Sequence, residues 1–212
     1  MRSWGRTDLR ARTLQALACL LVALGLASLG NEAHADTIEV REVRLEAQDD
    51  GWTLYAEFGL ELSSRLEEAV NKGVPLYFNL EFELTRPRWY WLDEKTQQAV
   101  QTYKLSYHAL TQSYRLSAGS LYQSFPTLKE AIRLLARPRL FAIDRQKVAP
   151  GETYTAQVRM RLDATQLPKA FQINALTSRE WTLESEWRKF SFRPDAGSAG
   201  GAAAGAAPGG QK

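Results

Sequence analysis

Apolar and polar residues alternate along three stretches of the chain. The stretches cover residues 52–62, 76–85 and 154–162, and in each of them every second side chain is apolar. A period of two places alternate side chains on opposite faces of a strand, so each stretch is predicted to form a half-buried antiparallel strand. The pattern therefore predicts a fold that consists mainly of sheets.

Turn residues separate these strands from their predicted neighbours. Residues 49–51 (DDG) follow a predicted strand at 38–47, and residues 150–151 (PG) follow another at 140–148, which predicts two hairpins. The apolar phase slips between Val40 and Val43, which predicts a β-bulge. The related segments YKLS and YRLS within residues 103–117 predict a third hairpin with its turn at 109–112.

Two short helices are expected to interrupt the strands. Ser63 or Ser64, followed by Glu67, predicts a helix that ends near residue 73. Thr127 and Glu130 form a second capping box, and this helix is predicted to end before Pro138. The arginines at its end, Arg133, Arg137 and Arg139, are interpreted as complementing the helix dipole.

Together these elements predict an all-β, mainly antiparallel fold. About eight strands with two short helices are typical of an immunoglobulin-like or fibronectin-like β-sandwich, with a β-barrel as the alternative. The domain is expected to span residues 36–193. The last segment, 194–212, is rich in glycine and alanine and is predicted to be a disordered tail.

The first 35 residues have the order of a secretory signal peptide. Four arginines precede an apolar run at residues 14–29, and a small-residue A-x-A site ends at Ala35. Because the apolar run is shorter than the roughly 20 residues that span a bilayer as a helix, cleavage after Ala35 is predicted. The protein is thus expected to be periplasmic, and the alternative is an inner-membrane anchor formed by the uncleaved signal.

Removal of this segment narrows the chemistry that remains. It carries the only cysteine, Cys19, as well as four arginines, two acidic residues and His34, so the net charge falls from +3 to +1. The basic balance of the whole chain is therefore no argument for nucleic-acid binding. One histidine and no cysteine also leave no common zinc site and no Cys–His pair. We expect no metal, no cofactor and no enzymatic activity.

Two places in the sequence stand out as candidates for binding. The segment RPRWYW places two arginines beside three aromatic residues, which suits an anionic glycan or a partner protein of the cell envelope. The alternative is that its tryptophans fill the core. His108, the only histidine after residue 35, is the second candidate. The candidate binding residues are therefore Arg86, Arg88, Trp89, Tyr90, Trp91 and His108.

The residues 103–117 (YKLSYHALTQSYRLS), the later block from Leu167 to Trp181 and the signal segment resemble a secreted proteobacterial family known only as domain of unknown function 4390. The resemblance spans residues 38–192. It implies a periplasmic protein whose gene lies near a nitrogen-type sensor histidine kinase. It supplies no catalytic residues.

The sequence thus favours an exported, non-catalytic binding or interaction module, accessory to an envelope sensor. One alternative is a structural or folding-assistance protein that pairs its strand edges with client chains. The other is a hydrolase of envelope polymers that uses a carboxylate pair, such as Glu81 with Glu83, or Asp93 with Glu94.

Overall fold

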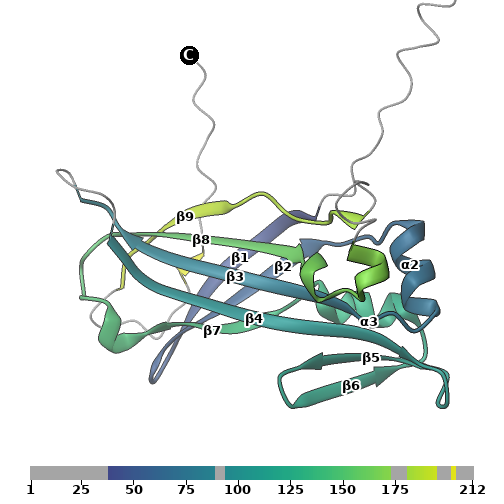
Figure 1. Cartoon of the computed structure of the whole chain (residues 1–212). Helices are drawn as coiled ribbons and strands as arrows, with labels where there is room; N and C mark the ends of the chain where they lie inside the picture. The colour runs from purple at the N-terminus through teal and green to yellow at the C-terminus, as the bar shows by residue number, and fades with distance from the viewer. Residues whose placement is uncertain (1–37, 89–93, 173–180, 195–201, 204–212) are drawn as a thin grey trace, which may run out of the picture. The chain divides into compact units, whose positions relative to one another are not determined.

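The computed structural model describes residues 38–88, 94–172, 181–194 and 202–203. Its strands form two antiparallel sheets that pack face to face around one hydrophobic core (Figure 1). This confirms the predicted β-sandwich class. The predicted signal peptide lies outside the described residues, as does the predicted tail except for residues 194 and 202–203.

The larger sheet has six strands in the order β6-β5-β4-β3-β8-β9. Four of them, from β3 to β6, follow one another as a meander. The sequence pattern does not specify this connectivity. The strands are β3 (Leu76–Arg86), β4 (Glu94–His108), β5 (Ser113–Ala118), β6 (Leu121–Phe125), β8 (Tyr154–Leu162) and β9 (Arg188–Phe192).

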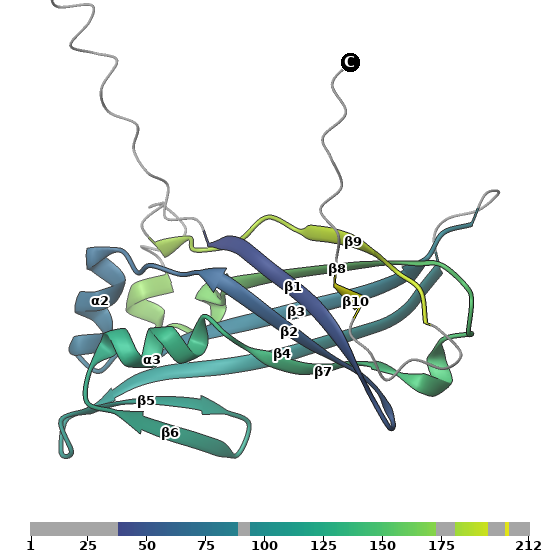
Figure 2. The ribbon, with the colours of Figure 1, turned by 180° about the vertical axis from the view of Figure 1, so that it is seen from behind.

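The smaller sheet has four strands in the order β10-β1-β2-β7. Its strands are β1 (Glu39–Gln48), β2 (Gly51–Gly59), β7 (Arg139–Asp144) and the two-residue β10 (Ala202–Ala203), which pairs with β1. Seen from behind in Figure 2, β1 and β2 cross the direction of β3 and β4. The side chains of β1, β2 and β7 that point away from the larger sheet form the outer face of this sheet.

Both predicted helices are present, and each begins at a side-chain cap. In α2 (Ser64–Asn71) the Ser63 hydroxyl accepts a hydrogen bond from the Leu66 backbone N–H, and in α3 (Leu128–Leu135) Thr127 accepts one from Glu130. These caps satisfy backbone donors that have no partner within the helix. Short 3₁₀ turns, η1 (Arg145–Lys147) and η2 (Ala164–Gln166), follow β7 and β8.

The two sheets approach each other at β4 and β7 without closing into a barrel. Tyr103 donates a hydrogen bond from its hydroxyl to the Arg139 carbonyl at 3.2 Å, and the Asp144 N–H donates to Gln97 Oε1 at 3.0 Å. Side chains rather than a continuous backbone ladder thus join the sheets here, and the described strands form no closed barrel. The barrel alternative is therefore set aside.

The hairpin predictions have different outcomes. The turns after β1 and β4 join paired strands, and the predicted bulge lies between Val40 and Glu42. The hairpin predicted at residues 150–151 is wrong, because β7 pairs with β2 whereas β8 pairs with β3 and β9. The PG turn instead carries the chain from one sheet to the other.

Gly51 allows β1, β2 and β7 to meet at one end of the smaller sheet. A Cβ at this position would lie 2.0 Å from the Ile143 carbonyl oxygen, well inside van der Waals contact. Only glycine permits this approach of two backbones without displacing β7. The sequence at the turn thus fixes the β2–β7 register on which the outer face depends.

Candidate functional site

The RPRWYW segment joins the paired ends of β3 and β4, where Arg86 lies opposite Glu94. Arg86 forms a 3.0 Å ion pair with Glu152, and Arg88 pairs with Glu94. Trp89, Tyr90 and Trp91 lie outside the described residues, so their placement in core or solvent stays a prediction. The two arginines are each already engaged by a carboxylate.

His108 lies at the opposite end of β4. Its Nδ1 is 3.1 Å from the Thr111 hydroxyl, within the β4–β5 turn. Because β4 has 15 residues, roughly 45 Å separates His108 from Glu94 at the rise of an extended strand. The structure therefore does not bring the two predicted candidates together.

The carboxylate pair on β3 belongs to a network that is closed on itself. Glu81 accepts hydrogen bonds from Arg159 at 2.7 Å and Arg161 at 2.6 Å, while Glu83 accepts from Gln157 at 2.8 Å. The Arg159 guanidinium also lies 4.5 Å from the centre of the Trp187 ring. Each of these groups thus already has a partner.

The pKa of Glu81 reflects this network. Burial alone would raise the pKa, but the hydrogen bonds from Arg161 and Arg159 outweigh that effect and hold it below the ordinary 4.5. Glu81 is therefore a stable carboxylate near neutral pH, which is the wrong state for a general acid.

The other carboxylate pair, Asp93 with Glu94, falls only half within the described residues. Glu94 is the partner of Arg88, and Asp93 lies outside the description. The Glu81–Glu83 pair thus has no free carboxyl group, and the arrangement of the Asp93–Glu94 pair stays a prediction.

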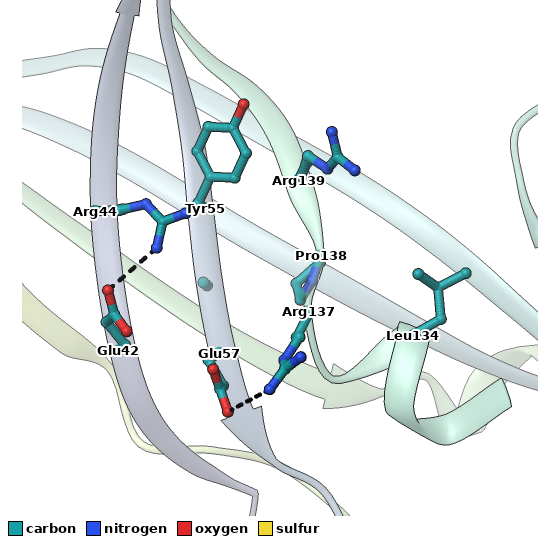
Figure 3. Close-up of a pocket in the computed structure, with 9 residues that line it drawn as sticks. Glu42, Arg44, Tyr55, Glu57, Leu134, Arg137, Pro138 and Arg139 are labelled. Atoms are coloured by element: carbon teal, nitrogen blue, oxygen red, sulfur yellow. Dashed lines mark hydrogen bonds and ion pairs between the residues drawn. The ribbon is translucent and has the colours of Figure 1, made fainter. Parts of the chain in front are cut away.

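A different set of residues forms a pocket of about 340 Å³ on the outer face of the smaller sheet (Figure 3). Three strands place one residue each in a cross-strand row that lines the pocket: Arg44 on β1 lies opposite Tyr55 on β2, which lies opposite Arg139 on β7. The guanidinium carbon of Arg44 is 5.0 Å from the centre of the tyrosine ring, and that of Arg139 is 5.9 Å from it. Two cations therefore flank one aromatic ring.

The walls of the pocket come from the end of α3 and the segment leading into β7. Leu134 and Pro138 supply apolar surface, and Arg137 reaches Glu57 on β2 at 3.4 Å. Figure 3 shows Arg137 and Glu57 together at one end of the pocket, with Tyr55 and Arg139 at the other. Backbone hydrogen bonds from Ala56 to the Pro138 carbonyl and from Phe58 to the Ala136 carbonyl hold this segment against β2.

The three arginines of the pocket differ in how far they are neutralised. Arg44 is shared between Glu42 at 3.2 Å and Glu46 at 2.8 Å, and their hydrogen bonds raise its pKa. Arg137 has Glu57. Arg139 is exposed, and it has no carboxylate within ion-pair distance among the described residues. It is therefore the cation in this pocket that is open to an anion from solution.

A second, more open pocket of about 690 Å³ adjoins the β1–β2 turn. Three aspartates line it, but Asp144 already accepts the Gln146 N–H at 2.9 Å as the cap of η1. Arg145 donates to the carbonyls of Gln48 and Asp49. No group of acidic and histidine side chains that suits a metal ion occurs in the described ranges.

The sequence pattern does not reveal the Arg44–Tyr55–Arg139 row, because strand register alone brings these residues together. Arg139 was assigned to the dipole of the second helix, yet it is the first residue of β7. Arg133 does lie in the last turn of α3. The usable signal was the alternation itself, which places Tyr55 on the solvent face of its strand.

The fold and site together define an antiparallel β-sandwich with a cationic, aromatic pocket on one outer face. The chain belongs to the family described as domain of unknown function (DUF4390), whose model matches residues 35–191. This confirms the resemblance stated from the sequence. No curated protein and no solved structure matches the chain. Of the helices in the described part, none has the length and apolar character needed to cross a membrane.

Proposed function

We propose that this protein is an exported, non-catalytic binding module that holds an anionic glycan of the cell envelope in the Arg44–Tyr55–Arg139 pocket. The observation that carries the proposal is the exposed Arg139 guanidinium beside Tyr55, which has no carboxylate partner among the described residues. An arginine fork in such a place binds carboxylates with two parallel hydrogen bonds.

The remaining surfaces of the pocket favour a sugar acid. Leu134 contributes an exposed apolar side chain to the lining, and Arg139 contributes donors. A uronic acid combines an apolar C–H face with a carboxylate on one ring, so both surfaces are used at once. The volume of about 340 Å³ lies within the range of small-ligand pockets.

Export is part of the proposal, because it would bring the domain to such a ligand. Cleavage after Ala35 would deliver the domain to the periplasm, where envelope glycans lie. A role as an accessory to an envelope sensor would follow if glycan binding changed what the domain presents to that sensor. N-terminal sequencing of the periplasmic protein should give a chain that begins at Asp36.

A hydrolase is less well supported. Glu81 and Glu83 are engaged by Arg159, Arg161 and Gln157, and the predicted histidine, His108, faces a hydroxyl rather than a carboxylate. A glycosidase would need two available carboxyl groups on either side of a substrate.

The test is a calorimetric titration of residues 36–212 with an oligogalacturonate. Arg139→Ala should weaken binding about tenfold or more, because a charged hydrogen-bonding partner of the carboxylate is lost. The matched control is Arg133→Ala, which removes an exposed arginine of α3 that does not line the pocket. It should leave the affinity unchanged.

Two outcomes would contradict the proposal. Equal binding of a neutral maltooligosaccharide would show that the carboxylate is not recognised. Binding of an oligoglutamate peptide in preference to the oligogalacturonate would place the ligand among acidic proteins instead of glycans.

A further inference from the structure

One long stretch of the chain contains no acidic residue. Residues 95–129 include lysines and an arginine but no aspartate or glutamate, although the chain as a whole has 24 acidic residues among 212. The stretch forms β5, β6 and all of β4 except its first residue, Glu94. Apart from that residue, three neighbouring strands of the larger sheet therefore carry positive charges only (Figure 1).

Strand register aligns two rows of side chains on the outer face of these strands. Leu105 and Leu116 lie opposite each other and are buried, so the residues next to them in sequence point outward. One row consists of Tyr77, Lys104, Ser117 and Tyr122, and the next consists of Ser106, Arg115 and Ser124. We call these seven residues the basic face.

The two cations of the basic face contact aromatic rings. The Lys104 Nζ atom lies 5.8 Å from the centre of the Tyr77 ring, and the Arg115 guanidinium carbon lies 4.4 Å from the centre of the Tyr122 ring. Within the part of the chain that the structure describes, neither cation has a carboxylate at ion-pair distance. Their charge is therefore available to an anion from outside.

Two carboxylates of neighbouring segments are already engaged by other groups. Glu81, further along β3, accepts hydrogen bonds from Arg159 and Arg161. Asp163, which follows β8, accepts one from Asn79 at 3.1 Å. These carboxylates therefore leave the positive charge of the basic face in place.

We propose that the basic face docks on the surface of an anionic lipid bilayer. Lysine and arginine side chains are attracted to such a surface when they lie within a Debye length of it. The serine hydroxyls can donate hydrogen bonds to phosphate oxygens. Tyrosine is enriched at the level of the lipid headgroups, because its ring is apolar and its hydroxyl is polar.

The composition of the basic face favours lipid headgroups over an acidic protein or a glycan. Lysine and serine are depleted in protein–protein interfaces, yet Lys104 and three serines make up more than half of this face. A glycan would stack on an open aromatic ring, but a cation of this chain already lies over the rings of Tyr77 and Tyr122.

The turn between β4 and β5 adds an apolar group. Leu110 in this turn is 93% exposed, and the turn joins the two strands that carry Lys104 and Arg115. The strength of surface binding to a bilayer depends on buried apolar area as well as on attraction to anionic lipids. We expect Leu110 to enter the apolar layer while the cations remain among the headgroups.

Co-sedimentation of residues 36–212 with lipid vesicles tests this inference. The protein should bind vesicles of an equal mixture of phosphatidylcholine and phosphatidylglycerol, and high salt should release it. Lys104→Gln and Arg115→Gln should each lower the partition coefficient about fivefold. Leu110→Gln should lower it about threefold or more. The matched control is Arg133→Gln, which removes an exposed arginine of α3 and should leave binding unchanged.

Circular dichroism should show that the double variant Lys104→Gln/Arg115→Gln keeps its fold, because both side chains lie on the surface of the sheet. No binding to the mixed vesicles, equal binding to pure phosphatidylcholine, or unchanged binding of the double variant would overturn the proposal. Tighter binding of an oligoglutamate peptide than of the vesicles, at equal concentrations of negative charge, would overturn it in favour of an acidic protein. The inference is independent of the glycan pocket, which lies on the other sheet.

Discussion

Arginine, carboxylate and aromatic side chains meet on the outer faces of both sheets, yet the two groups differ in how much of their bonding capacity is used. On the larger sheet the Glu81 side chain is 11% exposed and is held by two guanidinium groups, one of which lies over Trp187. On the smaller sheet the Glu42 side chain is 60% exposed, and Arg139 has no carboxylate partner in the described part of the chain.

The two groups contain the same residue types, yet one is a structural cluster and the other is the proposed binding site. Ion pairs that are withdrawn from water must be complete, because an unpaired buried charge is costly. Exposed ion pairs contribute little to stability, so their residues are free to serve a ligand. Composition alone does not distinguish the two; burial and the number of partners do.

The largest effect is expected when the closed cluster is broken. Glu81→Gln removes the charge that accepts hydrogen bonds from Arg159 and Arg161, and should lower the free energy of unfolding by about 2 kcal/mol. The melting temperature of a domain of this size should then fall by about 4–8 °C. Urea and thermal unfolding measure this change.

The same substitution on the open face is the control. Glu42→Gln removes an exposed partner of Arg44 and should leave unfolding unchanged within error. Equal destabilisation by both variants would remove the distinction between the two faces.

The second effect is the pH dependence of the closed cluster. The folded-state pKa of Glu81 lies below the ordinary 4.5, so its ionised form stabilises the fold above that pH. As the pH falls below about 4.5 toward the lowered pKa, this contribution is lost. The difference in unfolding free energy between the natural chain and Glu81→Gln should therefore shrink with acidification, as measured by urea titrations between pH 7 and 3.

Asp163 is a second carboxylate that makes the stability of both proteins sensitive to acid. Burial would raise its pKa, but hydrogen bonds from Gln166, Thr165 and Asn79 lower it below 3.8. Glu81→Gln should therefore retain some acid sensitivity. A difference between the two proteins that grows as the pH falls would contradict the assigned sign.

The sequence predicted those parts of the fold in which one face is buried and the other is solvated. The strand at β8 alternates without interruption, and Tyr154, Val158 and Met160 are buried as expected. The capping residues Ser63 and Thr127 likewise mark the helix starts, because a cap is a local interaction.

Elements without a buried face were missed for the same physical reason. The first half of β4, residues 94–102, has no buried residue, and β6 has four exposed residues out of five. Backbone pairing with a neighbour, rather than burial, makes these segments strands. Alternation carries no information about such pairing.

The pocket was missed because it depends on contacts between strands that are distant in sequence. Arg44, Tyr55 and Arg139 become neighbours only through the β1–β2 and β2–β7 registers. The sequence predicted the first hairpin but assigned β7 to a hairpin with β8. A β7–β8 hairpin would place Arg139 in the sheet of β8, away from Tyr55.

The smallest effect expected has the opposite sign to the others. Arg44 in the pocket is shared between Glu42 and Glu46, so Glu42→Gln releases part of its bonding capacity toward a ligand. Affinity for an oligogalacturonate should then rise about twofold, since competition from an exposed ion pair is weak. Calorimetric titration at low salt measures the gain, and it should diminish at high salt as the charges are screened. A loss of affinity would mean that Glu42 positions Arg44 for binding rather than competing for it, and the open face would then resemble the closed one in needing all of its ion pairs.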